Sequence, residues 1–382
     1  MSIPATKRKA PSSNASPSFS FGLLSDIQYA PINDGHSFSG TPRFYRHALK
    51  ASKVAALEFE RLGVDFAVNL GDIIDGNCQG DEAKGNTPRK GEDDEPHAKL
   101  MLNDVMANLS AYSGPWFHVY GNHELYNFDR GEIVKHLGIK GVLEEEDSGE
   151  ESTDDHANFV AYSSFSPAPG YKFIFVDSYD VSVLRRTGPK LEEAEKLLTS
   201  KNPNYALGNG NSPVGIKKVI DERYVMFNGA YGQTQLDWIR SELQKSKDQG
   251  EKVFLLGHQP FHPNTTPPIC LPWNYHILLK LIQGYPTTIV ATLGGHTHNA
   301  GYQKSAHGVH HCVVDAVLES KPPVASFLVV KVFDDTHFEI DGYGDCRRSS
   351  GVYDFRKRRA EGGEGGGKRR PPASNPESKD GG

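Results

Sequence analysis

The stretch FGLLSDIQYA, residues 21–30, begins as an apolar run and stops abruptly at Asp26, with Gln28 two residues later. In an extended chain, the side chains of residues two apart point to the same side. The Asp26 carboxylate and the Gln28 amide oxygen are therefore expected to point toward the same site. Ligands of open α/β sheets bind beyond the carboxyl ends of the strands. The stretch therefore predicts a buried strand that ends at a binding site.

Strands and helices alternate along the first part of the chain. Residues 44–63, FYRHALKASKVAALEFERLG, have apolar side chains at helical spacing and end in a glycine. The next apolar run, VDFAVNLGD, predicts a strand, and residues 234–247 predict a later helix with Thr234 as its N-cap. Beyond residue 310, strands follow one another without helices. The pattern predicts an α/β fold with a β-rich C-terminal part.

Composition divides the chain into one globular domain and two tails. Residues 1–18 and 346–382 are rich in Ser, Pro, Gly and charged side chains, so we expect both tails to be disordered and the domain to span 19–345. An acidic run at 144–155 is expected to be a surface loop, since it lacks the spacing of a calcium site.

Charge and cysteine usage narrow the class of protein. The net charge of −6 disfavours a dedicated nucleic-acid binder, and the four cysteines form no CxxC pair. The sequence shows no secretory signal and no apolar run of about 18 residues. We expect a monomeric cytoplasmic protein that binds neither nucleic acid nor membranes. Nuclear import through the basic clusters of the C-terminal tail is the alternative.

Five predicted strands end in side chains that can bind metal ions. These ends are SDIQ at 25–28, GDIID at 71–75, GNHE at 121–124, GHQP at 257–260 and GGHTH at 294–298. His296 and His298 repeat the spacing of Asp26 and Gln28, so each pair could hold one ion. Asp72 could bridge two ions with its two oxygens.

The ligand inventory suits a pair of divalent cations. It comprises two carboxylates, two amides and three imidazoles, from Asp26, Asp72, Gln28, Asn122, His258, His296 and His298. Two ions about 3.5–4 Å apart would fit such a set, and with a bridging hydroxide the site would keep about one positive charge. That charge suits an anionic phosphoester.

The ordered motifs resemble the calcineurin-like metallophosphoesterase superfamily. DIQYA, GDIIDG, GNHELYNF, SYDVSVL, FNGAYGQTQLDWI and CLPWNY together are similar to the manganese-dependent ADP-ribose/CDP-alcohol diphosphatases, over most of residues 20–345. The first motif departs from the superfamily pattern, because Gln28 stands where a histidine is usual. The resemblance implies a four-layer sandwich of two facing mixed β-sheets flanked by helices. It also implies hydrolysis of ADP-ribose, CDP-choline or CDP-glycerol to a nucleoside monophosphate and a second phosphate product, through attack by a metal-bridging hydroxide.

The resemblance also implies a role for each motif residue. Asp26, Gln28 and His298 would hold one ion, Asn122, His258 and His296 the other, and Asp72 would bridge them.

His123 would be the catalytic acid or electrostatic stabiliser. Glu124 is expected to orient His123, and Asp75 to orient a ligand histidine. Phe38, Arg43 and Cys270 are the candidate substrate-binding residues.

Gln28 bears on the choice of metal. An oxygen ligand in place of an imidazole makes that position harder, which favours Mn²⁺, or Mg²⁺, over Zn²⁺. The rival interpretation is that Gln28 weakens this position and leaves it partly empty.

Two other functions stay open at this stage. The same core could serve a phosphomonoesterase or a cyclic-nucleotide phosphodiesterase, which differs in its substrate loops. A metal-free interaction scaffold is the alternative of another class, but such a protein should have lost several ligands.

Overall fold

Two six-stranded mixed sheets form the centre of the protein. The computed structural model describes residues 16–37, 39–76, 78, 97–140, 161–334 and 336–355. The first sheet has the order β14-β13-β12-β1-β4-β5. Its strands are β1 (Phe19–Leu24), β4 (Phe66–Asn69), β5 (Trp116–His118), β12 (Phe327–Phe333), β13 (His337–Tyr343) and β14 (Gly351–Asp354). β1, β4 and β5 run parallel, whereas β12 pairs with β1 in the antiparallel sense.

The second sheet has the order β10-β11-β9-β8-β7-β6. Its strands are β6 (Ser163–Phe165), β7 (Tyr171–Phe175), β8 (Lys252–Leu256), β9 (Ile289–Gly294), β10 (Gly301–Lys304) and β11 (His310–Val313). β7, β8, β9 and β11 are parallel neighbours. A short hairpin of β2 (Gly35–His36) and β3 (Pro42–Arg43) stands apart from both sheets.

Helices connect the strands. The α-helices are α1 (Tyr45–Leu62), α2 (His97–Leu109), α3 (Asn122–Asn127), α4 (Arg130–His136), α5 (Gly188–Lys201), α6 (Gln233–Gln249) and α7 (Tyr275–Gln283). The short 3-10 helices are η2 (Val219–Arg223), η3 (Pro263–Thr265), η4 (Pro268–Cys270), η5 (Val317–Glu319) and η6 (Gly344–Ser349).

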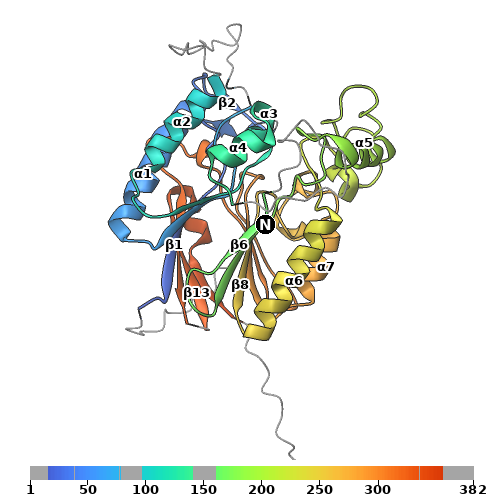
Figure 1. Ribbon diagram of the computed structural model, residues 1–382. Coiled ribbons are helices and arrows are strands. Elements are labelled where there is room, and N and C mark those ends of the chain that lie inside the picture. Colours follow the sequence, from blue (N-terminus) through green and yellow to red (C-terminus); the bar gives the residue numbers. More distant parts are fainter. Residues whose placement is uncertain are drawn as a thin grey trace, which may run out of the picture.

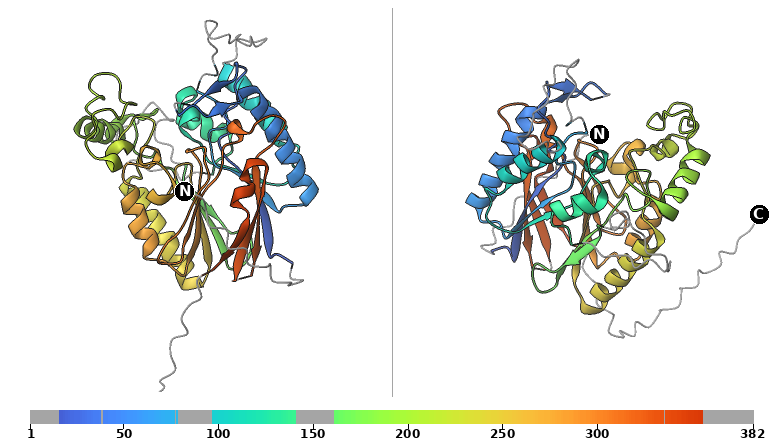
Figure 2. Two further views of the ribbon diagram at one scale, coloured as in Figure 1. Left: turned by 180° about the vertical axis from the view of Figure 1, so that it is seen from behind. Right: turned by 45° about the horizontal axis from the view of Figure 1, so that its top comes forward.

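Four layers stack in the order helices, sheet, sheet, helices. Between the sheets lies an aromatic core, where Phe21 of β1 meets Phe173 of β7 edge-on with ring centroids 5.2 Å apart. A second apolar cluster joins α1 and α2 to the first sheet, and a third joins α6 and α7 to the second sheet. Figures 1 and 2 show the two helical layers on opposite flanks of the sheets. The expected two facing mixed sheets flanked by helices are confirmed.

Local sequence explains where the long helices begin and end. α1 ends at Leu62 because Gly63 adopts a left-handed conformation with φ 62°, which favours glycine. Its buried face carries small side chains and Phe59, at helical spacing. The expectation that Thr234 caps α6 is wrong: the helix begins at Gln233, and Gly232 is its N-cap.

The C-terminal boundary of the domain also differs from the expectation. Residues after 345 were expected to lie in a disordered tail, yet Cys346 is fully buried and β14 pairs with β13 through Ile340 and Gly351. The boundary at 345 is therefore wrong, and the domain continues to Phe355. The expected tails at 1–15 and 356–382 and the acidic run at 144–155 lie outside the described residues. Among the residues that are described, no helix is both long enough and apolar enough to span a membrane.

Candidate metal centre

The candidate ligands all follow the carboxyl ends of parallel strands. Asp26 follows β1, Asp72 follows β4, Asn122 follows β5, His258 follows β8, and His296 and His298 follow β9. Backbone hydrogen bonds bring these ends together, from the Asp26 N–H to the Gly71 carbonyl and from the Gly295 N–H to the His258 carbonyl. The two sheets therefore present their polar strand ends to one shared place.

Most of these residues have unusual backbone conformations. Positive φ angles occur at Asp26 (52°), Gln28 (43°), Asp72 (53°), His296 (68°) and His298 (64°). For residues other than glycine, such conformations cost about 1–3 kcal/mol each and persist where the surrounding structure imposes them. The expectation that Asp26 and Gln28 converge through extended backbone is wrong. They converge because both residues turn into the left-handed region.

One cluster joins Asp26, Asp72 and His298, whose ligand atoms lie within 4.8 Å of one another. The Nε2 atom of His298 is 3.5 Å from the Oδ1 atom of Asp26. The side-chain nitrogen of Gln28 lies 2.9 Å from that Nε2 atom and donates to Asp72 Oδ2 at 3.0 Å. All four side chains are buried. This is the group of residues that the resemblance assigns to the first ion.

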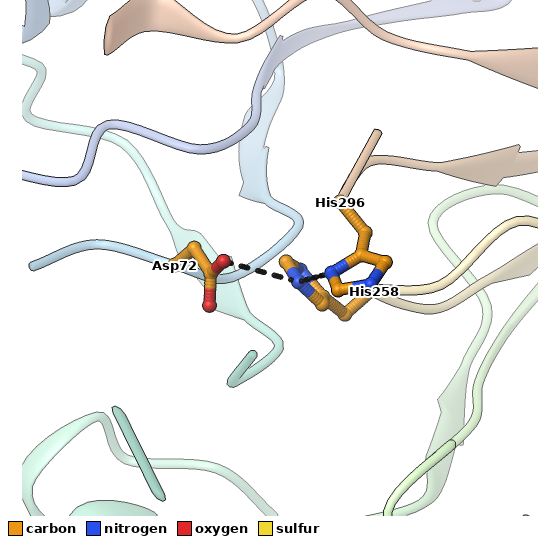
Figure 3. A group of neighbouring side chains, drawn as sticks. All are labelled: Asp72, His258 and His296. Atoms are coloured by element: carbon orange, nitrogen blue, oxygen red, sulfur yellow. Dashed lines mark hydrogen bonds and ion pairs between the residues drawn. The ribbon is translucent and has the colours of Figure 1, made fainter. Parts of the chain in front are cut away.

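A second cluster joins Asp72, His258 and His296, which approach from three separate segments in Figure 3. The Nε2 atom of His258 lies 3.4 Å from Asp72 Oδ2 and 3.1 Å from His296 Nδ1. The other ring nitrogen of His258 lies 2.7 Å from the Leu70 carbonyl oxygen, which fixes the plane of the ring. Asp72 belongs to both clusters, as a bridging ligand must. His296 and His298 fall in different clusters, so the expectation that this pair holds one ion is wrong.

Two tyrosines hold the amide of Asn122. The Tyr179 hydroxyl donates to Asn122 Oδ1 at 3.1 Å, and Asn122 Nδ2 donates to the Tyr126 hydroxyl at 3.0 Å. The next residue, His123, donates its backbone N–H to Asp72 Oδ1 at 2.9 Å. The two tyrosines therefore fix the orientation of the Asn122 amide, one residue before the backbone contact with Asp72.

Several buried atoms lack the partners that buried polar groups require. Asp26 Oδ1, Gln28 Oε1 and His296 Nε2 have no hydrogen-bond partner, although Asp26 is fully buried. An unpaired buried carboxylate oxygen is costly unless a cation compensates it. Two carboxylates and several imidazoles around these atoms fit a pair of divalent ions. Gln28 presents its amide nitrogen to the cluster. To act as an oxygen ligand, its amide group must rotate so that the oxygen and the nitrogen exchange places.

The charges of this site shift its protonation equilibria. Burial opposes the ionised form of Asp72, but electrostatic interactions with His258 and His123 beside it hold its pKa well below the usual range. Burial opposes the charged form of His258, yet Asp72 raises its pKa to about 9. Burial and the charge on His258 lower the pKa of His296 well below its ordinary value. Asp72 is therefore ionised, and His296 keeps lone pairs available for a metal.

Glu124 organises the turn that carries Asp72. Its carboxylate accepts four backbone N–H groups, from Asp72 at 2.9 Å, Ile73 at 2.6 Å, Ile74 at 3.2 Å and Gly121 at 2.7 Å. Burial and the charge on Asp72 raise the pKa of Glu124 to about 7, and the four donors oppose that rise because they stabilise the ionised form. The expected contact between Glu124 and the His123 side chain is not what the structure shows.

His123 lies beside Asp75 instead. Its Nδ1 atom is 3.4 Å from Asp75 Oδ2 and accepts the Gly76 N–H at 2.7 Å. Its Nε2 atom lies 3.9 Å from Asp72 Oδ2, and the side chain keeps 17% of its surface exposed. Asp75 was expected to orient a ligand histidine, but the structure places its carboxylate beside the candidate catalytic histidine. His123 can reach a substrate phosphate bound next to Asp72.

Two of the three predicted substrate residues lie in the part of the chain that the structure describes. Phe38 lies outside the described residues. The Nε atom of Arg43 lies 4.0 Å from Glu319 Oε1. The same carboxylate contacts His298, so Glu319 lies between Arg43 and that histidine. Cys270 ends η4, where burial raises the pKa of its thiol to about 12. The charge on Asp26 contributes to that rise, which places the thiol within electrostatic reach of the clusters.

Sequence reasoning missed the residues that hold the ligands in place. Tyr126 and Tyr179 contact Asn122, Glu319 contacts His298 at 3.0 Å, and the Phe227 ring lies 5.7 Å from the His296 ring. Glu319 could have been identified from the sequence, because it follows β11, the parallel neighbour of β9. It stands beyond a strand end, as the ligands do.

Comparisons with known proteins agree with this geometry. The family described as "Calcineurin-like phosphoesterase" matches residues 19–300. The manganese-dependent ADP-ribose/CDP-alcohol diphosphatase of Oryza sativa subsp. japonica is 36% identical over 326 residues, which cover 85% of this chain and 91% of that protein. The Homo sapiens protein of the same name is 34% identical over 348 residues, 90% of this chain and 94% of its own. The crystal structure of a dimetal phosphatase from Danio rerio superposes with a TM-score of 0.76 at 30% identity, covering 89% of this chain and 100% of that chain.

Proposed function

Because this chain belongs to the calcineurin-like phosphoesterase family, we propose that it hydrolyses the diphosphate linkage of ADP-ribose and CDP-alcohols with the help of two divalent cations. The relatives that cover most of its length bear the name of that activity and of manganese. The products would be a nucleoside monophosphate and a second phosphate. The observation that carries the proposal is the pair of buried clusters that share Asp72.

The ligand set supports Mn²⁺ as the preferred ion. Asp26, Gln28 and His298 would hold one ion, Asn122, His258 and His296 the other, with Asp72 common to both. The oxygen donors of Asp26, Asp72, Gln28 and Asn122 suit Mn²⁺ or Mg²⁺ better than Zn²⁺. When bound, the ions supply a deprotonated water at neutral pH and neutralise charge on the reacting phosphorus.

The protein's own groups position the substrate and stabilise its charge. Gly76 N–H donates to His123 Nδ1, so in the neutral ring the proton sits on Nε2, which faces Asp72. That N–H can donate to a phosphoryl oxygen or to the leaving oxygen. The leaving group is a phosphate, which needs little protonation, so we assign His123 mainly to electrostatic stabilisation.

Three further side chains are proposed to contact the substrate. Arg43 can pair with a phosphate in a bidentate manner, and Phe38 and Cys270 are assigned to the nucleotide. Oligomeric state, absence of nucleic-acid binding and cytoplasmic localisation stay predictions.

The test is a hydrolysis assay with metal-stripped protein. ADP-ribose, CDP-choline and p-nitrophenyl phosphate are offered in turn with Mn²⁺, Mg²⁺ or Zn²⁺. We expect Mn²⁺-dependent release of AMP and CMP, which His123→Ala abolishes and His307→Ala, an exposed control, leaves intact. Turnover of p-nitrophenyl phosphate without nucleotide release would retain the metal core but refute the substrate. No turnover and no metal binding would favour a scaffold.

A further inference from the structure

The short helix η5 ties the two strand-end segments of the first cluster together. Its residue Val317 donates its backbone N–H to the Ser25 carbonyl at 3.0 Å, and Leu318 donates to the Asp26 carbonyl at 3.1 Å. The preceding residue, Ala316, donates to the His298 carbonyl at 3.1 Å. η5 therefore spans the backbone of both Asp26 and His298, although the three segments are far apart in sequence.

The side chain at the end of η5 reaches the ring of His298. Glu319 Oε1 lies 3.0 Å from His298 Nδ1, with 11% and 7% of the two side chains exposed. A carboxylate at this distance accepts a hydrogen bond from the Nδ1–H group, so the lone pair of a neutral ring lies on Nε2. The Nε2 atom faces Asp26 and Gln28. Glu319 thus selects the tautomer and ring orientation that a metal ligand needs.

Arg43 backs Glu319 from the other side. Its Nε atom lies 4.0 Å from the same oxygen, Oε1, and 22% of its side chain is exposed. Arg43 belongs to the β2–β3 hairpin, and the next residue, Phe44, donates its N–H to the Leu318 carbonyl at 2.9 Å. The backbone around Glu319 is therefore fixed by hydrogen bonds, a cation lies near its carboxylate, and solvent has little access to it.

We infer that Glu319 is a positioning residue for the metal centre, which holds His298 Nε2 toward the ion shared with Asp26. The inference rests on the proposed dimetal function. Glu319 would act on the metal centre through His298, whose ring it contacts. Substituting Glu319 is therefore expected to weaken the binding of one of the two ions. Hydrogen-bond partners of a ligand histidine typically contribute about 10–100-fold to metal affinity or activity.

The test is a Mn²⁺ titration followed by electron paramagnetic resonance, which reports the free ion. Wild-type protein, Glu319→Gln, Glu319→Ala and the control Glu339→Gln are compared. Glu339 is a matched control because it lies 3.7 Å from another histidine, His337, on β13. We expect one of two ions to bind about 10–100-fold more weakly in Glu319→Ala. Glu319→Gln, which keeps an acceptor oxygen, should fall between wild type and Glu319→Ala.

Activity and melting temperature separate positioning from folding. For a positioning role, saturating Mn²⁺ restores the turnover number of Glu319→Ala, and the melting temperature of Glu319→Gln stays at the wild-type value. Unchanged affinity for both ions in Glu319→Ala would overturn the inference. Equal weakening of both ions together with a lower melting temperature in both variants would assign Glu319 a structural role, which also overturns it. Wild-type protein that binds no Mn²⁺ would refute the dimetal function and the inference with it.

Discussion

Replacing Gly121 with alanine is expected to displace Asp72 from its shared position. Gly121 precedes Asn122 in extended backbone, with φ −107° and ψ −169°, which alanine can adopt without strain. An added Cβ would lie 2.0 Å from Asp72 Oδ1 and 2.7 Å from a ring carbon of His258. Non-bonded heavy atoms pack at about 3.5 Å or more. The methyl group would therefore push Asp72 away by about 1.5 Å.

The displacement has a calculable effect on function. Misplacing a reacting or coordinating group by about 1 Å can cost about 100-fold in rate. We expect kcat/KM for ADP-ribose with Mn²⁺ to fall by about that factor, and Mn²⁺ to bind more weakly. Overpacking a buried site typically costs about 1–3 kcal/mol of unfolding free energy, so the variant should remain folded at room temperature.

The assay measures AMP release, Mn²⁺ affinity and chemical denaturation on the same preparations. The matched control is Gly351→Ala on β14, where an added Cβ meets nothing closer than 3.6 Å. It should behave as wild type in all three measurements. Wild-type Mn²⁺ affinity and AMP release in Gly121→Ala would contradict this prediction, because they would show that Asp72 is not confined by the backbone at Gly121.

Three further predictions concern buried groups around the site and in the core. Tyr179→Phe removes the 3.1 Å hydrogen bond to Asn122, and we expect Mn²⁺ to bind about tenfold more weakly in a titration; unchanged affinity would contradict the orienting role. Arg130→Met leaves the buried carboxylate of Asp177 without its closest cation, which lies 3.4 Å away. Urea denaturation should show that the unfolding free energy falls by about 3–5 kcal/mol. A fall of less than about 1 kcal/mol would contradict a stabilising role of this buried ion pair. Burial lowers the pKa of His118 from 6.5 to about 4, so the unfolded chain takes up the proton first as pH falls. The folded state should therefore lose about 3 kcal/mol between pH 6.5 and 4 through this residue, and His118→Phe should flatten that part of the pH–stability curve.

The strand-end pattern made much of the fold and site predictable. Apolar runs that stop at an acid or a histidine indicate strands whose carboxyl ends carry ligands, and the structure brings Asp26, Asp72, His258 and His298 together there. The helix over residues 45–62 followed from apolar spacing and Gly63. Both signals are local, so a single sequence contains them.

Other features depend on contacts between distant segments, which spacing alone does not reveal. Glu124 was assigned to its neighbour His123, but its carboxylate binds the backbone of the turn at residues 72–74, some 50 positions away. Asp75, three residues beyond Asp72, lies beside His123 instead. The role of Glu319 depends on η5 crossing two strand ends. The boundary at 345 was wrong because pairing with β13 orders β14 despite its polar flanks.

In the proposed function, two ions bound around Asp72 drive cleavage of a nucleotide diphosphate. A single titration can test this: metal-stripped protein receives Mn²⁺ in steps, and bound Mn²⁺ and AMP released from ADP-ribose are measured in the same samples. We expect two bound ions per chain and a rate of AMP release that rises with occupancy of the second. Full activity with one ion or none, or two bound ions without AMP release, would contradict it.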